Sequence, residues 1–87
     1  MTEEELANIE ARCARVTGGP WRSWIEGRDH TSGSNIISTS GADIELSGAT
    51  DADQDFIAAA RQDVPALLAD IARLRADLSD HANRRKS

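Results

Sequence analysis

The large apolar side chains of this chain are concentrated in one segment, and that concentration is the strongest constraint on its fold. Nearly half of them lie between Phe56 and Leu78, although the whole chain has only 87 residues. A domain of this length buries only about 60% of the surface that its unfolded chain exposes. The remaining residues are too few to cover the segment, so the sequence predicts self-association.

Apolar residues in this segment recur with a period of seven. The pattern resembles the a and d positions of a parallel two-stranded coiled coil. In such a dimer, Asp70 of one chain lies near Arg75 of the other. We therefore predict a homodimer or higher oligomer. The repeat consists of Ile57, Val64, Ile71 and Leu78 at the first position and Ala60, Leu67 and Leu74 at the second. The predicted interface residues on this segment are Leu67, Ile71, Leu74 and Leu78.

An ordinary packed helix is the alternative to the coiled coil. Only about two heptads follow Pro65, whereas a coiled coil usually needs three or four. Leu68 also widens the apolar stripe. The front half of the segment, up to about Ile71, can therefore pack on a sheet of its own chain, while little remains to cover the residues beyond Leu74.

Pro65 interrupts this helical pattern. Proline lacks a backbone N–H and costs about 3 kcal/mol inside a helix, whereas it is favoured in the first turn. The sequence therefore predicts a short helix at about 52–62, begun by Thr50 or Asp51, and a longer one at 64–82, capped by Asp63. A single kinked helix is the alternative.

The N-terminal third predicts one further helix. Thr2 and Glu5 have the spacing of a capping box, and the turn at 18–20 contains two glycines and a proline, which end the helix. One apolar stripe follows the helical period and consists of Leu6, Ile9, Cys13 and Val16.

The middle of the chain predicts strands. Segments 21–26, 35–40 and 43–47 are rich in branched or aromatic residues, and the last two form a hairpin around Gly41 and Ala42. The predicted fold class is α+β: an N-terminal helix, a small antiparallel sheet of about three strands, and one short and one longer C-terminal helix. We expect a single domain over 1–83 and a basic disordered tail over 84–87.

The charge distribution argues against several classes of partner. The net charge is −5, and residues 1–80 carry seven arginines against fifteen acidic residues, a net of −8. Nucleic-acid binding needs clustered positive charge, so a nucleic-acid partner is not expected. No apolar run is long enough for a membrane span, no signal peptide is recognised, and the single Cys13 cannot form an internal disulfide. We therefore expect a cytoplasmic protein without a membrane partner.

No catalytic or metal-binding motif is recognised, so we expect no enzymatic activity, no cofactor and no metal. The acidic run 51–55 lacks the glycine and the glutamate of a calcium loop, because Phe56 and Gln62 occupy those positions. Asp29, His30 and the serines at 32 and 34 share one polar loop and cannot orient one another as a catalytic triad requires. His30, His81 and Cys13 do not have the spacing of metal ligands.

Both tryptophans lie in the same short segment. Trp21 follows a rigid turn, and we predict that it locks a helix onto the sheet. Trp24 lies three positions later, so in a strand it points to the opposite face. We predict that Trp24 is an interface residue.

Two stretches resemble the Ead-like early proteins of bacteriophages and prophages. Residues 16–21 (Val-Thr-Gly-Gly-Pro-Trp) resemble the Thr-Pro-Gly-Pro-Trp signature of that family, with Gly18 in place of its first proline. Residues 53–61 and 63–68 resemble its closing signature. The resemblance implies a non-enzymatic phage accessory protein, and the matched positions, which we expect to be structural, are Gly19, Pro20, Trp21, Phe56 and Pro65.

Together these features predict an accessory protein that binds itself and an unknown host or phage protein. One alternative is a sponge for a nucleotide signal, which would be favoured by Arg22 and Arg28 converging near Trp24. Another is an acidic decoy that mimics nucleic acid, which would be favoured by acidic side chains clustered on one face.

Overall fold

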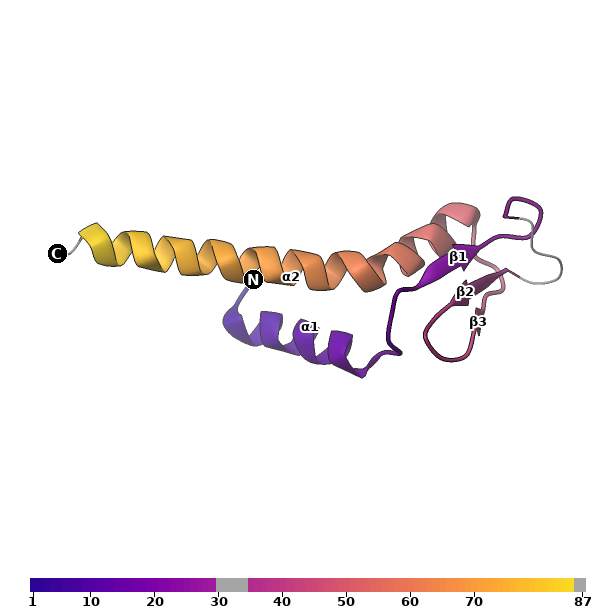
Figure 1. Ribbon diagram of the computed structural model, residues 1–87, viewed down its shortest axis with the longest axis horizontal. Coiled ribbons are helices and arrows are strands. Elements are labelled where there is room, and N and C mark those ends of the chain that lie inside the picture. Colours follow the sequence, from indigo (N-terminus) through magenta and orange to yellow (C-terminus); the bar gives the residue numbers. More distant parts are fainter. Residues whose placement is uncertain (30–34, 86–87) are drawn as a thin grey trace.

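The computed structural model describes residues 1–29 and 35–85, without the side chains of 83–85. The elements follow the order helix, three strands, helix (Figure 1), which confirms the α+β class. Their bounds are α1 Glu3–Arg15, β1 Arg22–Trp24, β2 Ile36–Ser38, β3 Ile44–Glu45 and α2 Asp51–Arg85.

The molecule is strongly elongated. Its principal extents are 64 × 22 × 21 Å, and its radius of gyration is 18.0 Å, whereas a compact domain of this length has about 12 Å. Figure 1 shows that α2 runs along most of the length, with the sheet at its N-terminal end and α1 beside its middle. The C-terminal part of α2 extends beyond both.

One continuous helix occupies the last third of the chain, so the prediction of two helices was wrong. The 35 residues of α2 include Pro65 in the interior, and Asp63 does not cap a second helix. The missing N–H of Pro65 leaves the carbonyl of Arg61 without its usual helical partner. The helix persists because apolar contacts with α1 continue on both sides of Pro65, which itself lines the space between the helices with Leu6 and Leu68.

The start of α2 has the predicted cap at Thr50. Thr50 Oγ1 accepts a hydrogen bond from the Asp53 N–H at 3.0 Å, and Asp53 Oδ2 accepts one from the Thr50 N–H at 3.1 Å. This reciprocal pair satisfies a backbone donor of the first turn. At the other end, α2 continues through Arg85, two residues into the predicted tail. Lys86 and Ser87 lie outside the described residues.

Replacing Pro65 with alanine tests how much free energy the proline costs inside the continuous helix α2. Because alanine restores the backbone hydrogen bond but loses the contact of the ring with α1, we expect Pro65→Ala to raise the free energy of unfolding by about 2 kcal/mol. Urea denaturation followed by circular dichroism measures the change. As a control, Ala76→Pro in the exposed part of α2 should lower the helical signal. An unchanged or lower stability of Pro65→Ala contradicts the expectation.

The three strands form one antiparallel sheet in the order β1-β2-β3. The strands are shorter than the predicted segments but lie within them. Ser23 pairs with Ile37, which in turn pairs with Ile44, so these side chains share the face toward α2. Trp24 and Ile36 form the next pair and lie on the outer face.

The core is very small. Within the described residues, the buried apolar side chains are Ile25, Ile37 and Ala58, and the only buried polar one is Gln54. Ile37 is fully buried, which resolves the adjacent isoleucines of β2: Ile37 faces α2 and the half-buried Ile36 faces outward. So few buried groups cannot stabilise a domain as a large apolar core does.

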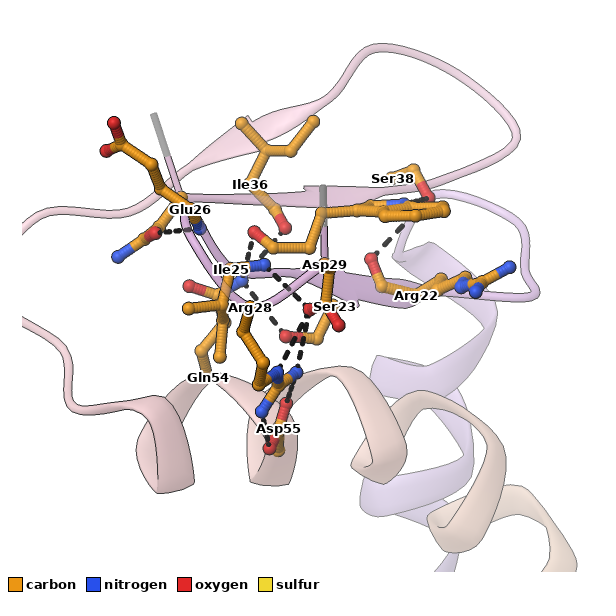
Figure 2. Close-up of polar contacts among 12 residues, drawn as sticks. Arg22, Ser23, Ile25, Glu26, Arg28, Asp29, Ile36, Ser38, Gln54 and Asp55 are labelled. Atoms are coloured by element: carbon orange, nitrogen blue, oxygen red, sulfur yellow. Dashed lines mark hydrogen bonds and ion pairs between the residues drawn. The ribbon is translucent and has the colours of Figure 1, made fainter. Parts of the chain in front are cut away.

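A buried amide connects α2 to the sheet. Gln54 is 1% exposed, and its Nε2 donates to Ser23 Oγ at 3.0 Å, to the Trp24 carbonyl at 3.1 Å and to the Ile36 carbonyl at 2.9 Å (Figure 2). One amide group therefore serves three acceptors on two strands. This arrangement fixes α2 relative to β1 and β2.

A second glutamine binds the chain just before β1. Gln62 Oε1 accepts from the Trp21 N–H at 2.8 Å, and Gln62 Nε2 donates to the Trp21 carbonyl at 3.2 Å. Gln62 thus pairs with the backbone of Trp21 as a neighbouring strand does. Gln54 and Gln62 lie about 12 Å apart along the helix axis, so the two amides hold both ends of this edge of the sheet against α2.

Gln54→Leu tests the buried amide. Leucine removes the two N–H groups that these three part-buried oxygen atoms share, so we expect a loss of about 3 kcal/mol in the free energy of unfolding. The matched control is Gln62→Leu, which should cost about 1 kcal/mol because water reaches the exposed backbone groups of Trp21. Equal losses for the two variants contradict the role assigned to burial.

Candidate protein-binding surface

Polar contacts at both ends hold α1 against α2. Near its start, Arg75 of α2 pairs with the Glu3 carboxylate and donates to the Met1 carbonyl at 2.7 Å. Beyond its end, Arg61 Nε donates to the Thr17 carbonyl at 3.2 Å. The two helices therefore run antiparallel, with α1 beside residues 61–75 of α2.

The start of α1 has the predicted capping box. The Glu5 N–H donates to Thr2 Oγ1 at 3.1 Å, and Glu5 Oε1 accepts from the Thr2 N–H at 2.9 Å. The backbone N–H and the hydroxyl of Thr2 lower the pKa of Glu5. The helix ends at Arg15, before the predicted turn, with Val16 extended as its C-cap.

Half-buried side chains of α1 face α2, but they do not enclose a core. Leu6, Ile9 and Cys13 are half-buried, and no residue of α1 is fully buried. A helix of 13 residues is about 20 Å long, whereas one of 35 residues is about 52 Å long. More than half the length of α2 is therefore beyond the reach of α1.

Several large apolar side chains of α2 are left uncovered. Five of its large apolar side chains are between 39% and 74% exposed. We call them the open face of α2, and they are Phe56, Ile57, Leu67, Leu74 and Leu78.

Four of the five residues of the open face belong to the seven-residue repeat, and the exception is Phe56. Leu67 and Leu74 hold its second position, and Leu78, 69% exposed, holds the first position beyond the reach of α1. Ile71 is only half-buried because it lies against α1. Of the four predicted interface residues of α2, three are thus open and Ile71 is shared with the intramolecular contact.

Phe56 is the clearest error among the residues expected to be structural. It was expected in the core, but it is 74% exposed. Gln54 faces the sheet, and a residue two positions later lies about 200° further around the helix. Phe56 therefore points away from the sheet and extends the open face toward the N-terminus of α2.

Charged residues lie on both sides of the open face. Asp63, Asp70 and Asp77 are exposed and recur every seven residues, which places them along one side of the leucines. We call them the acidic flank. On the other side, Arg61 of α2 and Arg12 of α1 line a groove that also contains Ile57, and we call these two arginines the basic flank. Asp70 also approaches Arg73 at 3.6 Å.

The predicted interface residue Trp24 belongs to a different surface. It is half-buried on the outer face of the sheet, where its indole N–H donates to Ser38 Oγ at 3.0 Å. The guanidinium carbon of Arg22 lies 4.1 Å from the centre of its ring, a cation–π arrangement. The structure therefore does not bring Trp24 together with the leucines of α2.

Trp21 lies where α1, the following turn and α2 meet. Its indole N–H donates to the Thr17 carbonyl at 2.9 Å, and its side chain lines the groove that contains Ile57 and Val64. Trp21 therefore contacts the helices, in addition to the bonds of its backbone with Gln62.

The preceding turn is closely packed. The Gly19–Pro20 peptide bond is cis. The Gly18 carbonyl accepts from the Ser40 N–H at 3.0 Å, and a Cβ atom at Gly18 would lie 2.9 Å from Ser40 Oγ. A larger residue at position 18 therefore requires the Ser40 side chain to move.

An ion cluster connects the loop after β1 to α2 (Figure 2). Arg28 binds Asp55 through two nitrogens, at 2.8 and 3.0 Å, and also contacts Asp29 at 2.9 Å. Hydrogen bonds from Arg28, and secondarily from Ser23, lower the pKa of Asp55. Hydrogen bonds from Arg28, and secondarily from the Ile25 N–H, lower the pKa of Asp29. Asp55 and then Asp29 raise the pKa of Arg28. Both carboxylates already bind the Arg28 guanidinium.

The acid stability of the protein should depend on this cluster. The pKa values of Asp29 and Asp55 in the folded chain lie below their ordinary value of 3.8. Near and below that value the unfolded chain therefore binds more protons than the folded chain. The stabilisation is complete above about pH 4 and is lost as the pH falls through the lowered folded values. We expect the thermal midpoint of Arg28→Ala to fall less steeply below pH 4 than that of the wild type.

The matched control for this measurement is Arg73→Ala. Arg73 is exposed and approaches Asp70 within its own helix at 3.6 Å, so its removal should leave the pH profile unchanged. If Arg28→Ala shows the same slope as the wild type between pH 5 and pH 2.5, the cluster does not account for acid sensitivity.

Several residues that organise the structure were not identified from the sequence. Gln54, Gln62 and Arg28 all make long-range hydrogen bonds. In the sequence, Gln54 and Gln62 resemble ordinary exposed helical residues. The only available signal was spacing, because Gln54, Ala58 and Gln62 recur every four residues and share one helix face.

The remaining candidates do not form a site within the described residues. No helix in that part of the chain is long and apolar enough to cross a bilayer. Across residues 1–29 and 35–85, no three His, Cys, Asp or Glu side chains are arranged to hold a metal ion. The polar loop residues His30, Ser32 and Ser34 lie outside the described residues.

Comparison of the chain with protein-family models, with curated proteins and with solved structures finds no match. The open face of α2 is therefore interpreted from its own geometry.

Proposed function

We propose that this chain is a non-enzymatic accessory protein that acts by protein–protein binding and works as a dimer. The second copy covers the open face of α2. The observation that carries the proposal is this face: five large apolar side chains remain exposed, whereas only three of the described residues are buried apolar ones. An apolar surface of this kind marks an interaction site rather than an ordinary solvent-exposed surface.

The accessible surface supports an obligate partner. It measures 6508 Å², whereas a compact monomer of 9.4 kDa exposes about 5000 Å². The excess, about 1500 Å² per chain, is larger than the roughly 800 Å² that each partner buries in a standard protein interface. A dimer thus supplies the apolar burial that the single chain lacks.

The resemblance to Ead-like early proteins is the basis on which we propose a biological role for the dimer. On that reading, the dimer is a phage or prophage accessory factor that binds a host or defence protein in the cytoplasm. The outer face of the sheet, with Trp24 and Arg22, is a second exposed surface available for that partner.

The two alternative functions receive less support. A nucleotide sponge was to be favoured by Arg22 and Arg28 converging near Trp24, whereas Arg28 binds the carboxylates of Asp29 and Asp55. An acidic decoy was to be favoured by clustered acidic side chains. The acidic flank of α2 does form a row, but it borders a line of leucines, and apolar burial is not what nucleic-acid mimicry requires.

Sedimentation equilibrium tests the proposal. We expect the wild type to be dimeric at about 100 μM, where even a weak dimer is populated. Leu74→Asp combined with Leu78→Asp should give a folded monomer, because buried aspartates oppose association and both leucines are more than half exposed in the single chain. Near-ultraviolet circular dichroism of the two tryptophans reports that the variant remains folded.

The control adds the same two charges to a different face. Ala76 and Ser79 are exposed on the side of α2 away from the leucines, so Ala76→Asp with Ser79→Asp should remain dimeric. A wild-type monomer at about 100 μM would remove the proposal.

A further inference from the structure

We infer that the second copy on the open face lies parallel to the first, so that the acidic flank of each chain meets the basic flank of the other. This inference rests on the proposed dimer and specifies its geometry. It also differs from a simple two-stranded coil, because α1 of each copy contributes to the contact.

Two-fold symmetry reduces the possible arrangements to two. Copies related by a two-fold axis meet through the same surface. When the two α2 helices are parallel, the acidic flank of one copy faces the basic flank of the other. When they are antiparallel, each flank faces itself, and Asp63, Asp70 and Asp77 of both copies lie opposite one another.

The charges favour the parallel arrangement. Opposed rows of exposed aspartates repel, whereas opposite charges across an interface attract and set its orientation. In a parallel two-fold dimer, equivalent residues lie at the same height along the helix axis. Arg12 lines the groove beside Ala60 and Val64, at the height of Asp63. Asp63 of each copy therefore faces Arg12 of the second copy.

In the single chain, Arg75 is engaged by groups other than the expected partner Asp70. Arg75 binds Glu3 and the Met1 carbonyl of its own chain, so its charge is already paired. The basic flank lies further toward the sheet, and among the described residues neither Arg12 nor Arg61 forms an ion pair, although Arg61 donates to the Thr17 carbonyl. The acidic flank is thus complemented near Asp63 rather than near Asp70.

Beyond Arg75, the two α2 helices have no α1 beside them. Here the dimer reduces to a two-stranded coil in which Leu74 and Leu78 of both copies pack together. His81 follows Leu74 by seven residues and is exposed. In a parallel dimer the two copies of residue 81 are adjacent, within the range of a disulfide. In an antiparallel dimer they lie at opposite ends of the contact.

Disulfide formation therefore distinguishes the orientations. In a Cys13→Ala background, we expect His81→Cys to form an intermolecular disulfide on mild oxidation. Ala76→Cys, on the opposite side of the helix, should not. A dimer by sedimentation that forms no disulfide at position 81 overturns the parallel arrangement and leaves the proposed function intact, whereas a monomer overturns both.

Charge reversal tests the predicted pair directly. Asp63→Arg and Arg12→Asp should each raise the dissociation constant by about fivefold or more, because each substitution removes both symmetric copies of this exposed ion pair. The double variant should return to within about twofold of the wild type, because the pair is restored with its charges exchanged. Independent, additive losses in the double variant overturn the pairing of Asp63 with Arg12.

Discussion

The length of α2 is the constraint on which the rest of the structure depends. A helix of 35 residues is about 52 Å long, and the sheet and α1 contact only its first three-quarters, up to Arg75. Each of these elements covers one side of the helix. A side and an end consequently remain open, and the apolar residues there are the ones that the chain cannot bury itself. The elongated shape and the small core follow from the same mismatch.

Within one chain, polar contacts carry much of the arrangement that an apolar core would otherwise fix. Gln54 and Gln62 hold α2 along β1, while Arg61 and Arg75 hold the two ends of α1. Hydrogen bonds of this kind specify position well but contribute only modest net free energy. The single chain is therefore well oriented but weakly stabilised, and covering the open face adds the missing apolar burial.

Local signals in the sequence predicted much of this fold. The capping box at Thr2, the cap at Thr50 and the three strands all depend on neighbouring residues, and the structure has each of them. Pro65, Gln54 and Phe56 were misjudged for a common reason. Their environments depend on tertiary packing: α1 stabilises the helix around Pro65, the sheet encloses Gln54, and the direction of that contact exposes Phe56. Three of the predicted interface residues were placed by periodicity alone and proved to be open.

The central claim is that the fold of one chain is completed by a second copy on α2. Its most direct test is the thermal midpoint of unfolding measured over a range of protein concentrations. For a chain whose stability includes association, mass action raises the midpoint as concentration rises. The account predicts such a rise between about 1 and 100 μM in the wild type, and its absence in a variant with polar residues on the open face. A wild-type midpoint independent of concentration would contradict the account.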